Sequence, residues 1–194
     1  PVGPFHLGDN RPKVFRGTLT KSTFQRMMNA SYSVSRPAKI REWKLHPLST
    51  PETAVYYKHK RAVVVHRGTS GVLDNLNNMA WITDQFTGGQ SYETTGRFKR
   101  AWKIQQQVED LFGAHEVYTL GHSQGGLLAS RVATNKENVL AVNAPEAEGV
   151  SHFRNTSDLV SLLAHSTYSI PTATNIFNLL GNHSVDAVLH SWEL

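Results

Sequence analysis

The pattern of apolar and polar residues predicts a chain in which strands and helices alternate. Residues 53–66 contain two strand-like runs around a polar KHK segment at 58–60, which predicts a β-hairpin. The second run, at 62–65, is uniformly apolar, as a strand buried on both faces should be. Such a strand favours a parallel sheet covered by helices.

Residues 97–112 have the periodicity of an amphipathic helix that ends before Gly113. The pattern places Phe98, Ala101, Trp102, Val108, Leu111 and Phe112 on one face, and Lys99, Arg100, Lys103, Gln106, Glu109 and Asp110 mostly on the other. A strand at 116–121, a helix from about Gln124 to Asn135 and a strand at 138–143 follow. This order predicts an α/β fold with a mostly parallel central sheet flanked by helices.

The rest of the chain carries weaker signals. Residues 1–20 are rich in glycine, proline and polar side chains, which predicts a loop, and 21–30 has the composition of a short helix. A weaker strand is expected at 151–155, and 171–180 is open between a helix and a surface loop. The length of 194 residues suits a single domain spanning 1–194.

One motif in this pattern carries chemistry. Gly121, Ser123 and Gly125 form Gly-x-Ser-x-Gly, where the expected strand runs into the expected helix. A serine at such a sharp turn exposes its hydroxyl, and glycine two residues away on each side relieves the steric collision. The main-chain N–H of Gln124, at the start of the helix, can donate to an oxyanion. The alternative is a glycine-rich turn with a bystander serine.

A serine hydroxyl becomes a nucleophile when a base takes its proton. In hydrolases with this motif the chain order is serine, acid, histidine. We favour His183 as the base, because it lies in a Gly-Asn turn before an expected C-terminal helix. His152, His165 and His190 also follow the serine, and His190 and His165 are the competing bases.

Asp158 is the favoured acid because it follows the expected strand at 151–155, where side chains project at the carboxyl edge of a parallel sheet. Glu146 and Asp186 are the competing acids, and Asp186 can instead cap a final helix. His122, beside the serine, is expected to point away from it and to pack in the interior.

Composition narrows the chemistry further. The chain has no cysteine, which excludes disulfides, thiolate catalysis and cysteine metal sites. No apolar run reaches the length of a membrane span, and the first residues do not have the pattern of a signal peptide. The compartment therefore stays open.

The charge is uneven along the sequence. Residues 1–60 hold eleven basic and three acidic residues, whereas 61–194 hold nine basic and twelve acidic. The basic third predicts either a solvated surface or a contact with an anionic membrane. The basic residues are dispersed and no nucleic-acid motif surrounds them, so nucleic acid is not the expected partner.

Several short motifs resemble those of one known family. They are AVVVHRGTS at 62–70, NMAWITD at 78–84, TLGHSQGG at 119–126, NAPEAEG at 143–149, RNTSDLVSLL at 154–163 and NHSVDAV at 182–188. Over residues 53–190, together and in this order, they resemble the fungal-lipase-like class 3 lipases, which have the α/β-hydrolase fold. Residues 1–50 form a basic lead-in to this region. His66 stands where the family usually has an aromatic residue, and Leu159 where it often has proline.

The resemblance implies a compact α/β-hydrolase fold with Ser123 as nucleophile, Asp158 as acid and His183 as base. It also implies an oxyanion hole formed by Thr69 and Gln124, and it matches 71–84 to the lid of true lipases. Independently of the family, Arg67 is expected to form an ion pair, for instance with Asp84, and Trp81 belongs either to an apolar lid face or to the core.

The expected function is therefore that of a serine hydrolase that cleaves carboxylic esters of lipids, phospholipids or small acyl compounds, with no metal or organic cofactor. Two alternatives stay open. The same serine could transfer the acyl group to an acceptor other than water. The chain could instead be a non-catalytic lipid- or nucleic-acid-binding domain that keeps the fold.

Overall fold

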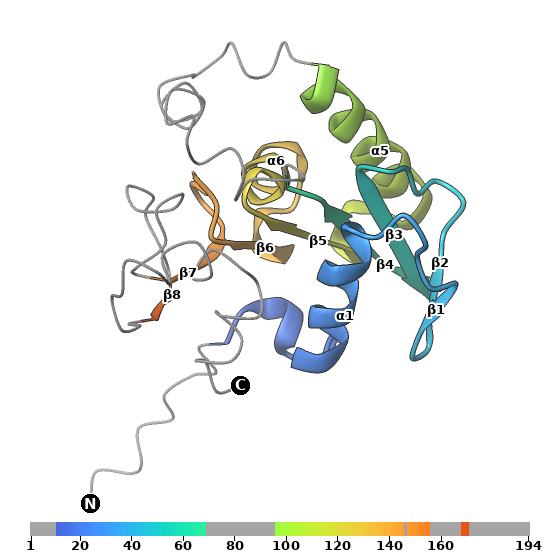
Figure 1. Ribbon diagram of the computed structural model, residues 1–194, viewed down its shortest axis with the longest axis horizontal. Coiled ribbons are helices and arrows are strands. Elements are labelled where there is room, and N and C mark those ends of the chain that lie inside the picture. Colours follow the sequence, from blue (N-terminus) through green and yellow to red (C-terminus); the bar gives the residue numbers. More distant parts are fainter. Residues whose placement is uncertain (1–10, 69–95, 146, 156–167, 171–194) are drawn as a thin grey trace, which may run out of the picture.

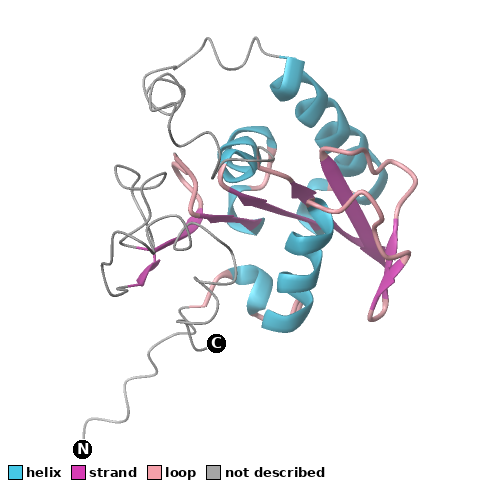
Figure 2. Ribbon diagram, in the orientation of Figure 1, coloured by secondary structure: helices cyan, strands magenta, loops and turns pink. Residues whose placement is uncertain are grey.

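The centre of the structure is a mixed β-sheet flanked by helices (Figures 1 and 2). The computed structural model describes residues 11–68, 96–145, 147–155 and 168–170. Within them the sheet has eight strands in the same order in space as in sequence. The strands are β1 (Lys39–Ile40), β2 (Trp43–Leu45), β3 (Thr53–Lys58), β4 (Arg61–His66), β5 (Val117–His122), β6 (Val139–Val142), β7 (Ser151–Asn155) and β8 (Tyr168–Ile170).

The pairing mode changes once across this sheet, at β4. β1 to β4 pair in antiparallel fashion, and each pairing from β4 to β8 is parallel. The predicted hairpin at 53–66 is confirmed as β3 and β4, with Lys58 opposite Arg61 at its turn. The α/β prediction is thus confirmed in its general form, with the parallel part confined to the strands after β3.

Helices cover both faces of the sheet. α1 (Lys21–Ser31) lies on one face, and α5 (Gly96–Phe112) and α6 (Gln124–Val132) lie on the other (Figure 1). Short 3₁₀ helices occur at Lys13–Phe15, Ala114–Glu116 and Lys136–Asn138 and are labelled η1, η2 and η3. None of the helices within the described residues is both long and apolar enough to cross a bilayer.

The strand β4 shows why both faces need cover. Val63 and Val65 point into the cluster that α1 completes, whereas Ala62 and Val64 pack with Val108 of α5. All four β4 residues are fully buried, as their uniformly apolar sequence predicts. This strand ends beside Ser123, so the packing of both helix layers fixes the position of its end next to the candidate site.

The N-terminal residues are part of the core, although the part of 1–20 that the structure describes is mostly loop, as predicted. Residues 13–15 form η1, and Phe15 packs edge-on against Phe24 of α1, with ring centroids 5.2 Å apart, and stacks on Phe153 of β7 at 6.2 Å. Sparse apolar residues in a glycine-rich stretch give no periodic signal, so only their distant partners reveal this packing. The short strands β1 and β2 were not predicted either.

The helix predicted at 21–30 is confirmed as α1, which begins after Thr20. The Oγ1 atom of Thr20 accepts the main-chain N–H of Thr23 at 3.2 Å, which is the usual capping interaction at a helix start.

The amphipathic face predicted for α5 is partly wrong. Trp102 is 51% and Leu111 64% exposed, whereas Gln105 and Glu109 are buried. The helix is rotated relative to the prediction because Thr119 of β5 and Thr134 after α6 offer hydrogen-bond partners to those two polar side chains. Thr134 also donates its main-chain N–H to Glu109, which explains why α6 ends at Val132 and not near Asn135.

We expect Phe24→Ala to lower the free energy of unfolding by about 3–5 kcal/mol, because the ring is fully buried between η1, α1 and the sheet. Urea denaturation followed by circular dichroism measures this. Val34→Ala is the control, since the Val34 side chain is fully exposed. Equal unfolding midpoints for the two variants would contradict the assignment of α1 to the core.

Candidate active site

Ser123 is the single residue between the end of β5 and the start of α6. Its backbone has φ 59° and ψ −126°, a combination that residues with a side chain rarely adopt and that costs about 1–3 kcal/mol. Its N–H donates to the Val142 carbonyl of β6 at 2.9 Å, and its carbonyl accepts the Gly126 N–H at 3.0 Å. The strained turn is therefore tied to the neighbouring strand and to the first turn of α6.

Three glycines around the serine are required by close backbone contacts. A Cβ on Gly121 would lie 2.0 Å from the Gly125 carbonyl oxygen, and a Cβ on Gly125 would lie 1.9 Å from the carbonyl oxygen of His66. A Cβ on Gly126 would meet the Cβ of Ala144 at 2.7 Å. These distances confirm that the motif glycines allow strand, turn and helix to approach one another.

The hydroxyl of Ser123 lacks a hydrogen-bond partner among the described residues. The residue has 0% exposed surface, and the Oγ atom is itself buried. Buried polar side chains are nearly always hydrogen-bonded, so an unpartnered hydroxyl on a strained backbone calls for an explanation. Its position suits a group that reacts with a ligand.

The start of α6 adds an electrostatic element beside this hydroxyl. Gln124 is the first residue of the helix, where a main-chain N–H has no carbonyl of its own helix to bind. The partial positive charge of the helix start therefore lies next to Ser123. Gln124 is buried, and its role as an oxyanion donor stays a prediction.

Most other predicted site residues lie outside the described residues. They are Thr69, Asp158, His183, the competing residues Glu146, His165, Asp186 and His190, the expected lid at 71–84, and Trp81 and Asp84. Two described residues that precede Thr69 and Asp158 in the sequence lie near Ser123 or at the same edge of the sheet. Gly68, which precedes Thr69, is so close that a Cβ on it would lie 3.1 Å from the Ser123 Cβ. β7 runs parallel to β6, so Asn155, at its carboxyl end, lies at the same edge of the sheet as Ser123.

His152 has a structural role. It is fully buried on β7, and its Nε2 accepts the main-chain N–H of Ala144 at 2.9 Å. An acceptor nitrogen that is already engaged cannot take a proton from a serine, so His152 is not the base. Asn143, the residue before Ala144, is also buried and has φ 45°, so the turn after β6 is tightly held.

His66, at the end of β4, joins a buried chain of hydrogen bonds on the α5 side of the sheet. Its Nδ1 lies 3.1 Å from Thr53 Oγ1, and its Nε2 lies 3.0 Å from Gln105 Oε1. Because an amide oxygen only accepts, Nε2 carries the proton and Nδ1 accepts from the threonine. Burial lowers the pKa of His66 to about 4, so the ring is neutral at pH 7.

The same chain continues through α5. The Nε2 of Gln105 donates to Thr119 Oγ1 at 2.8 Å and to Glu109 Oε1 at 3.0 Å, and Thr134 Oγ1 donates to Glu109 Oε2 at 2.6 Å. His66 thus connects the end of β4 to α5. Nothing in the sequence pattern indicated this network, because its members come from separate elements.

Tyr32 is the residue at this site that the sequence analysis missed. It follows α1, and its hydroxyl lies 2.7 Å from Nδ1 of His122 and accepts the Gly68 N–H at 3.1 Å. His122 is buried, as expected for a packing role, but it also takes part in this contact. The sequence gives no sign that a residue ninety positions away meets the serine turn.

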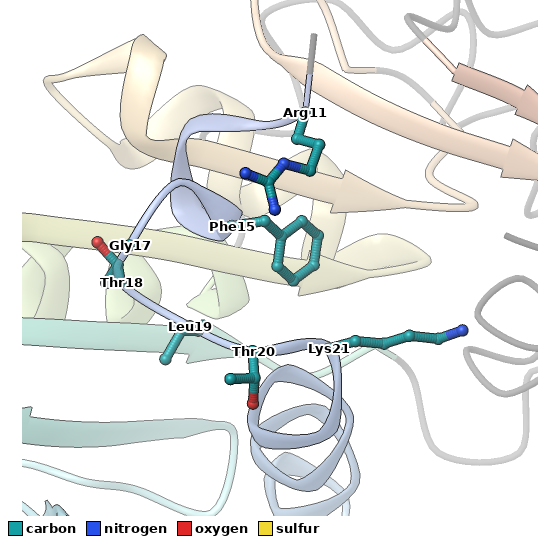
Figure 3. A pocket seen from close by; sticks show the side chains of 7 residues that line it. All are labelled: Arg11, Phe15, Gly17, Thr18, Leu19, Thr20 and Lys21. Carbon is teal, nitrogen blue, oxygen red and sulfur yellow. The ribbon is translucent and has the colours of Figure 1, made fainter. Parts of the chain in front are cut away.

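Two grooves lie at the end of the sheet where β4 begins, opposite to the end that carries Ser123. The first, of about 410 Å³, surrounds the loop between η1 and α1 and is shown in Figure 3; it is lined by Arg11, Phe15, Gly17, Thr18, Leu19, Thr20 and Lys21. The second, of about 400 Å³, is lined by Gly17, Thr18, Trp43, Lys58, His59, Lys60, Arg61 and Glu116. β4 begins at Arg61 and ends toward Ser123, so the second groove and the serine are about 20 Å apart.

No metal centre is visible in the part of the chain that the structure describes, since nowhere there do three histidine, aspartate or glutamate side chains come together as ligands. Comparisons of the chain with protein-family models, with curated proteins and with solved structures find no match. The case for function therefore depends on the geometry around Ser123.

Gly125→Ala is expected to lower the free energy of unfolding by about 3 kcal/mol or more, because the new methyl group would collide with backbone atoms of β4 that have no room to move. Gly96→Ala is the control, since among the described residues a Cβ there meets the flexible end of Arg100 and nothing else. Thermal unfolding of both variants measures the difference. A Gly125→Ala protein as stable as the control would contradict the close approach of α6 to β4.

The neutral His66 predicts a pH dependence of stability. Its pKa is about 4 in the folded chain and about 6.5 when unfolded, so the unfolded state binds the extra proton first. The contribution is fully present above pH 6.5 and is lost as the pH falls toward 4, by about 3 kcal/mol in all. Urea unfolding between pH 7.5 and 4 measures this loss, and His66→Phe should flatten the profile. An equally steep profile in His66→Phe would contradict the prediction.

Proposed function

We propose that the chain is a serine hydrolase of the α/β-hydrolase fold that cleaves carboxylic esters through an acyl-enzyme on Ser123. The observation that carries the proposal is the buried hydroxyl of Ser123, which has no hydrogen-bond partner among the described residues and lies on a backbone with φ 59° and ψ −126°. Strained backbone of this kind clusters at active sites, where surrounding contacts hold a reactive group in place. A bystander serine would give no reason for the strain.

The arrangement of the sheet supports the same proposal. The serine follows a parallel strand in the interior of the sheet and is followed at once by a helix packed on that strand. In open α/β sheets, ligands bind at the carboxyl ends of the strands, which is where Ser123 and Gly68 lie. The resemblance of residues 53–190 to class 3 lipases, stated above from short motifs, is consistent with this geometry.

The proposed reaction has two halves. Ser123 Oγ attacks the ester carbonyl while His183 takes its proton, and Asp158 orients the ring and stabilises its charged form. The main-chain N–H groups of Thr69 and Gln124 stabilise the oxyanion, each worth about 3 kcal/mol of barrier. The carbon–oxygen bond of the leaving alcohol then breaks, and the alcohol takes the proton from His183.

Water completes the cycle by attacking the acyl-enzyme, with His183 removing a proton from the water and returning one to Ser123. The substrate class we propose is a carboxylic ester of a lipid, phospholipid or small acyl compound. If the acceptor is another alcohol instead of water, the same steps give acyl transfer. Product analysis in the presence of added alcohols distinguishes the two.

The geometry gives less support to a membrane-docking role for the basic residues. Lys58, Lys60 and Arg61 line a groove about 20 Å from the serine, at the opposite edge of the sheet. An anionic membrane held there would face away from Ser123. A non-catalytic binding domain would use that groove and leave the strained serine turn without a role.

A fluorophosphonate probe, which reacts with activated serines, is expected to label the wild-type chain, and Ser123→Ala is expected to abolish the labelling. Ser130→Ala is the matched control, because Ser130 lies on the same helix and its hydroxyl donates to the Leu127 carbonyl at 2.8 Å. In-gel fluorescence and mass spectrometry of the labelled peptide read the result. Hydrolysis of p-nitrophenyl esters of increasing chain length then defines acyl preference.

Two results would count against the proposal. A folded wild-type chain that the probe does not label would exclude an activated serine. Labelling that persists in Ser123→Ala would place the reactive group elsewhere. Labelling lost in both serine variants would instead show that α6 had been disturbed, so the thermal midpoints of both are measured alongside.

A further inference from the structure

The end of α1 is fixed to the rest of the molecule by one arginine. Arg36 donates through Nε to the Ala30 carbonyl at 3.0 Å and through Nη2 to the Ser31 carbonyl at 3.2 Å, at the last turn of the helix. The same Nη2 donates to the carbonyl of Pro51 at 3.0 Å, in the loop before β3. These contacts join the helix end to the loop before β3 and thereby set the place of Tyr32, the next residue after α1.

The hydroxyl of Tyr32, which directly follows the end of α1, contacts the residues around the serine turn. It lies 2.7 Å from His122 Nδ1 and accepts the Gly68 N–H at 3.1 Å. The two rings also meet edge to face, with centroids 5.8 Å apart. The space is tight, because a Cβ on Gly68 would lie 2.4 Å from the phenol oxygen and 3.1 Å from the Ser123 Cβ. The phenol of Tyr32, the backbone that follows β4 and Ser123 are therefore in close contact.

The protonation of the phenol follows from its surroundings. Burial raises the pKa of Tyr32 to about 12, so the hydroxyl keeps its proton at neutral pH, although 37% of the residue surface is exposed. The phenol oxygen accepts the Gly68 N–H and also lies at hydrogen-bond distance from His122 Nδ1.

The contact occurs where the sheet stops holding its strands together. The ladder between β4 and β5 ends at the pair His66 and Gly121. Beyond it, Gly68 leaves β4 and Ser123 leaves β5, and the Tyr32 hydroxyl bridges Gly68 to His122. The side chain of Tyr32, which follows α1, thus continues the connection between the two strands after their main-chain pairing has ended.

We propose that Tyr32 is a positioning residue for the reaction at Ser123: its hydroxyl holds the backbone that leaves β4 at a fixed distance from the serine turn. The inference rests on the proposed function, in which the residue after Gly68 supplies an oxyanion donor. Tyr32 acts through Gly68 and His122. A displacement of about 1 Å at such a donor can cost around 100-fold in rate.

Tyr32→Phe tests the proposal, because it removes the hydroxyl and keeps the ring against His122. Tyr56→Phe is the matched control: Tyr56 is buried on the same side of the sheet, and its hydroxyl donates to the Pro37 carbonyl at 3.0 Å, away from the serine. Steady-state hydrolysis of a p-nitrophenyl ester gives kcat and KM, and the rate of fluorophosphonate labelling reports the serine directly.

The expected result for Tyr32→Phe is a kcat lowered about 10- to 100-fold with KM changed less than about twofold, at a thermal midpoint near that of Tyr56→Phe. The labelling rate should fall in parallel, since the probe also forms an oxyanion. Equal kcat values for the two variants would overturn the proposal. So would a loss in Tyr32→Phe that appears entirely in KM.

A readout independent of activity separates this inference from the proposed function. Hydrogen exchange at the Gly68 amide and the ¹⁵N shifts of the His122 ring are measured in the wild type and in Tyr32→Phe. The variant should exchange the Gly68 amide at least about tenfold faster and shift the ring nitrogens. If Tyr32→Phe shows these changes but the fluorophosphonate probe does not react with the wild type, the proposed hydrolase activity is refuted, and with it the catalytic role of the contact. If the probe reacts with the wild type but Tyr32→Phe shows neither the faster exchange nor the shifted ring nitrogens, the role of Tyr32 alone is refuted.

Discussion

The close approach of β4, β5 and the start of α6 is the constraint on which the candidate site depends. Gly125 packs its Cα against the carbonyl of His66, and Gly121 packs against the carbonyl of Gly125, so the chain has almost no freedom at this point. Ser123 takes the strained conformation because these contacts, and its hydrogen bonds to Val142 and Gly126, leave no relaxed alternative. The cost of about 1–3 kcal/mol is small beside the burial of the surrounding strands.

Two polar connections hold this arrangement from opposite faces of the sheet. On one face, the neutral ring of His66 joins the end of β4 to Gln105 of α5. On the other, Tyr32 joins the backbone after β4 to His122 at the end of β5. Because strand pairing alone stops at His66 and Gly121, these side chains extend the rigid part of the sheet to the residues nearest the serine. The strained turn is thus supported where the sheet would otherwise fray.

The N-terminal third contributes to the site through the packing of α1 and through one of its cations, Arg36, whereas its basic residues at the β3–β4 turn lie elsewhere. α1 fills the core on one face through buried side chains such as Phe24 and Met27, and Arg36 fixes its end. The basic side chains at the β3–β4 turn lie at the far edge of the sheet. A charge count along the sequence could not separate these two roles, because both kinds of residue occur in the same stretch.

How much the sequence could predict depends on how local each signal was. The hairpin at 53–66 and the turn at Ser123 were predicted because apolar runs and glycine spacing record them directly. The exposed Trp102 and the buried Glu109 were placed on the wrong sides, since the periodicity of α5 does not record the polar partners that other elements supply. Tyr32 was missed for a similar reason, because its contacts join residues far apart in sequence.

The central claim is that Ser123 is a reactive hydroxyl held in a strained turn with oxyanion donors beside it. A crystal structure of the chain after reaction with a phosphonate ester tests this most directly. We expect a phosphorus atom bonded to Ser123 Oγ, a positive φ at that residue, the phosphoryl oxygen accepting the Gln124 N–H, and an imidazole at hydrogen-bond distance from Oγ. An adduct on another residue, or a Ser123 with relaxed helical or extended backbone and no imidazole beside it, would contradict the account.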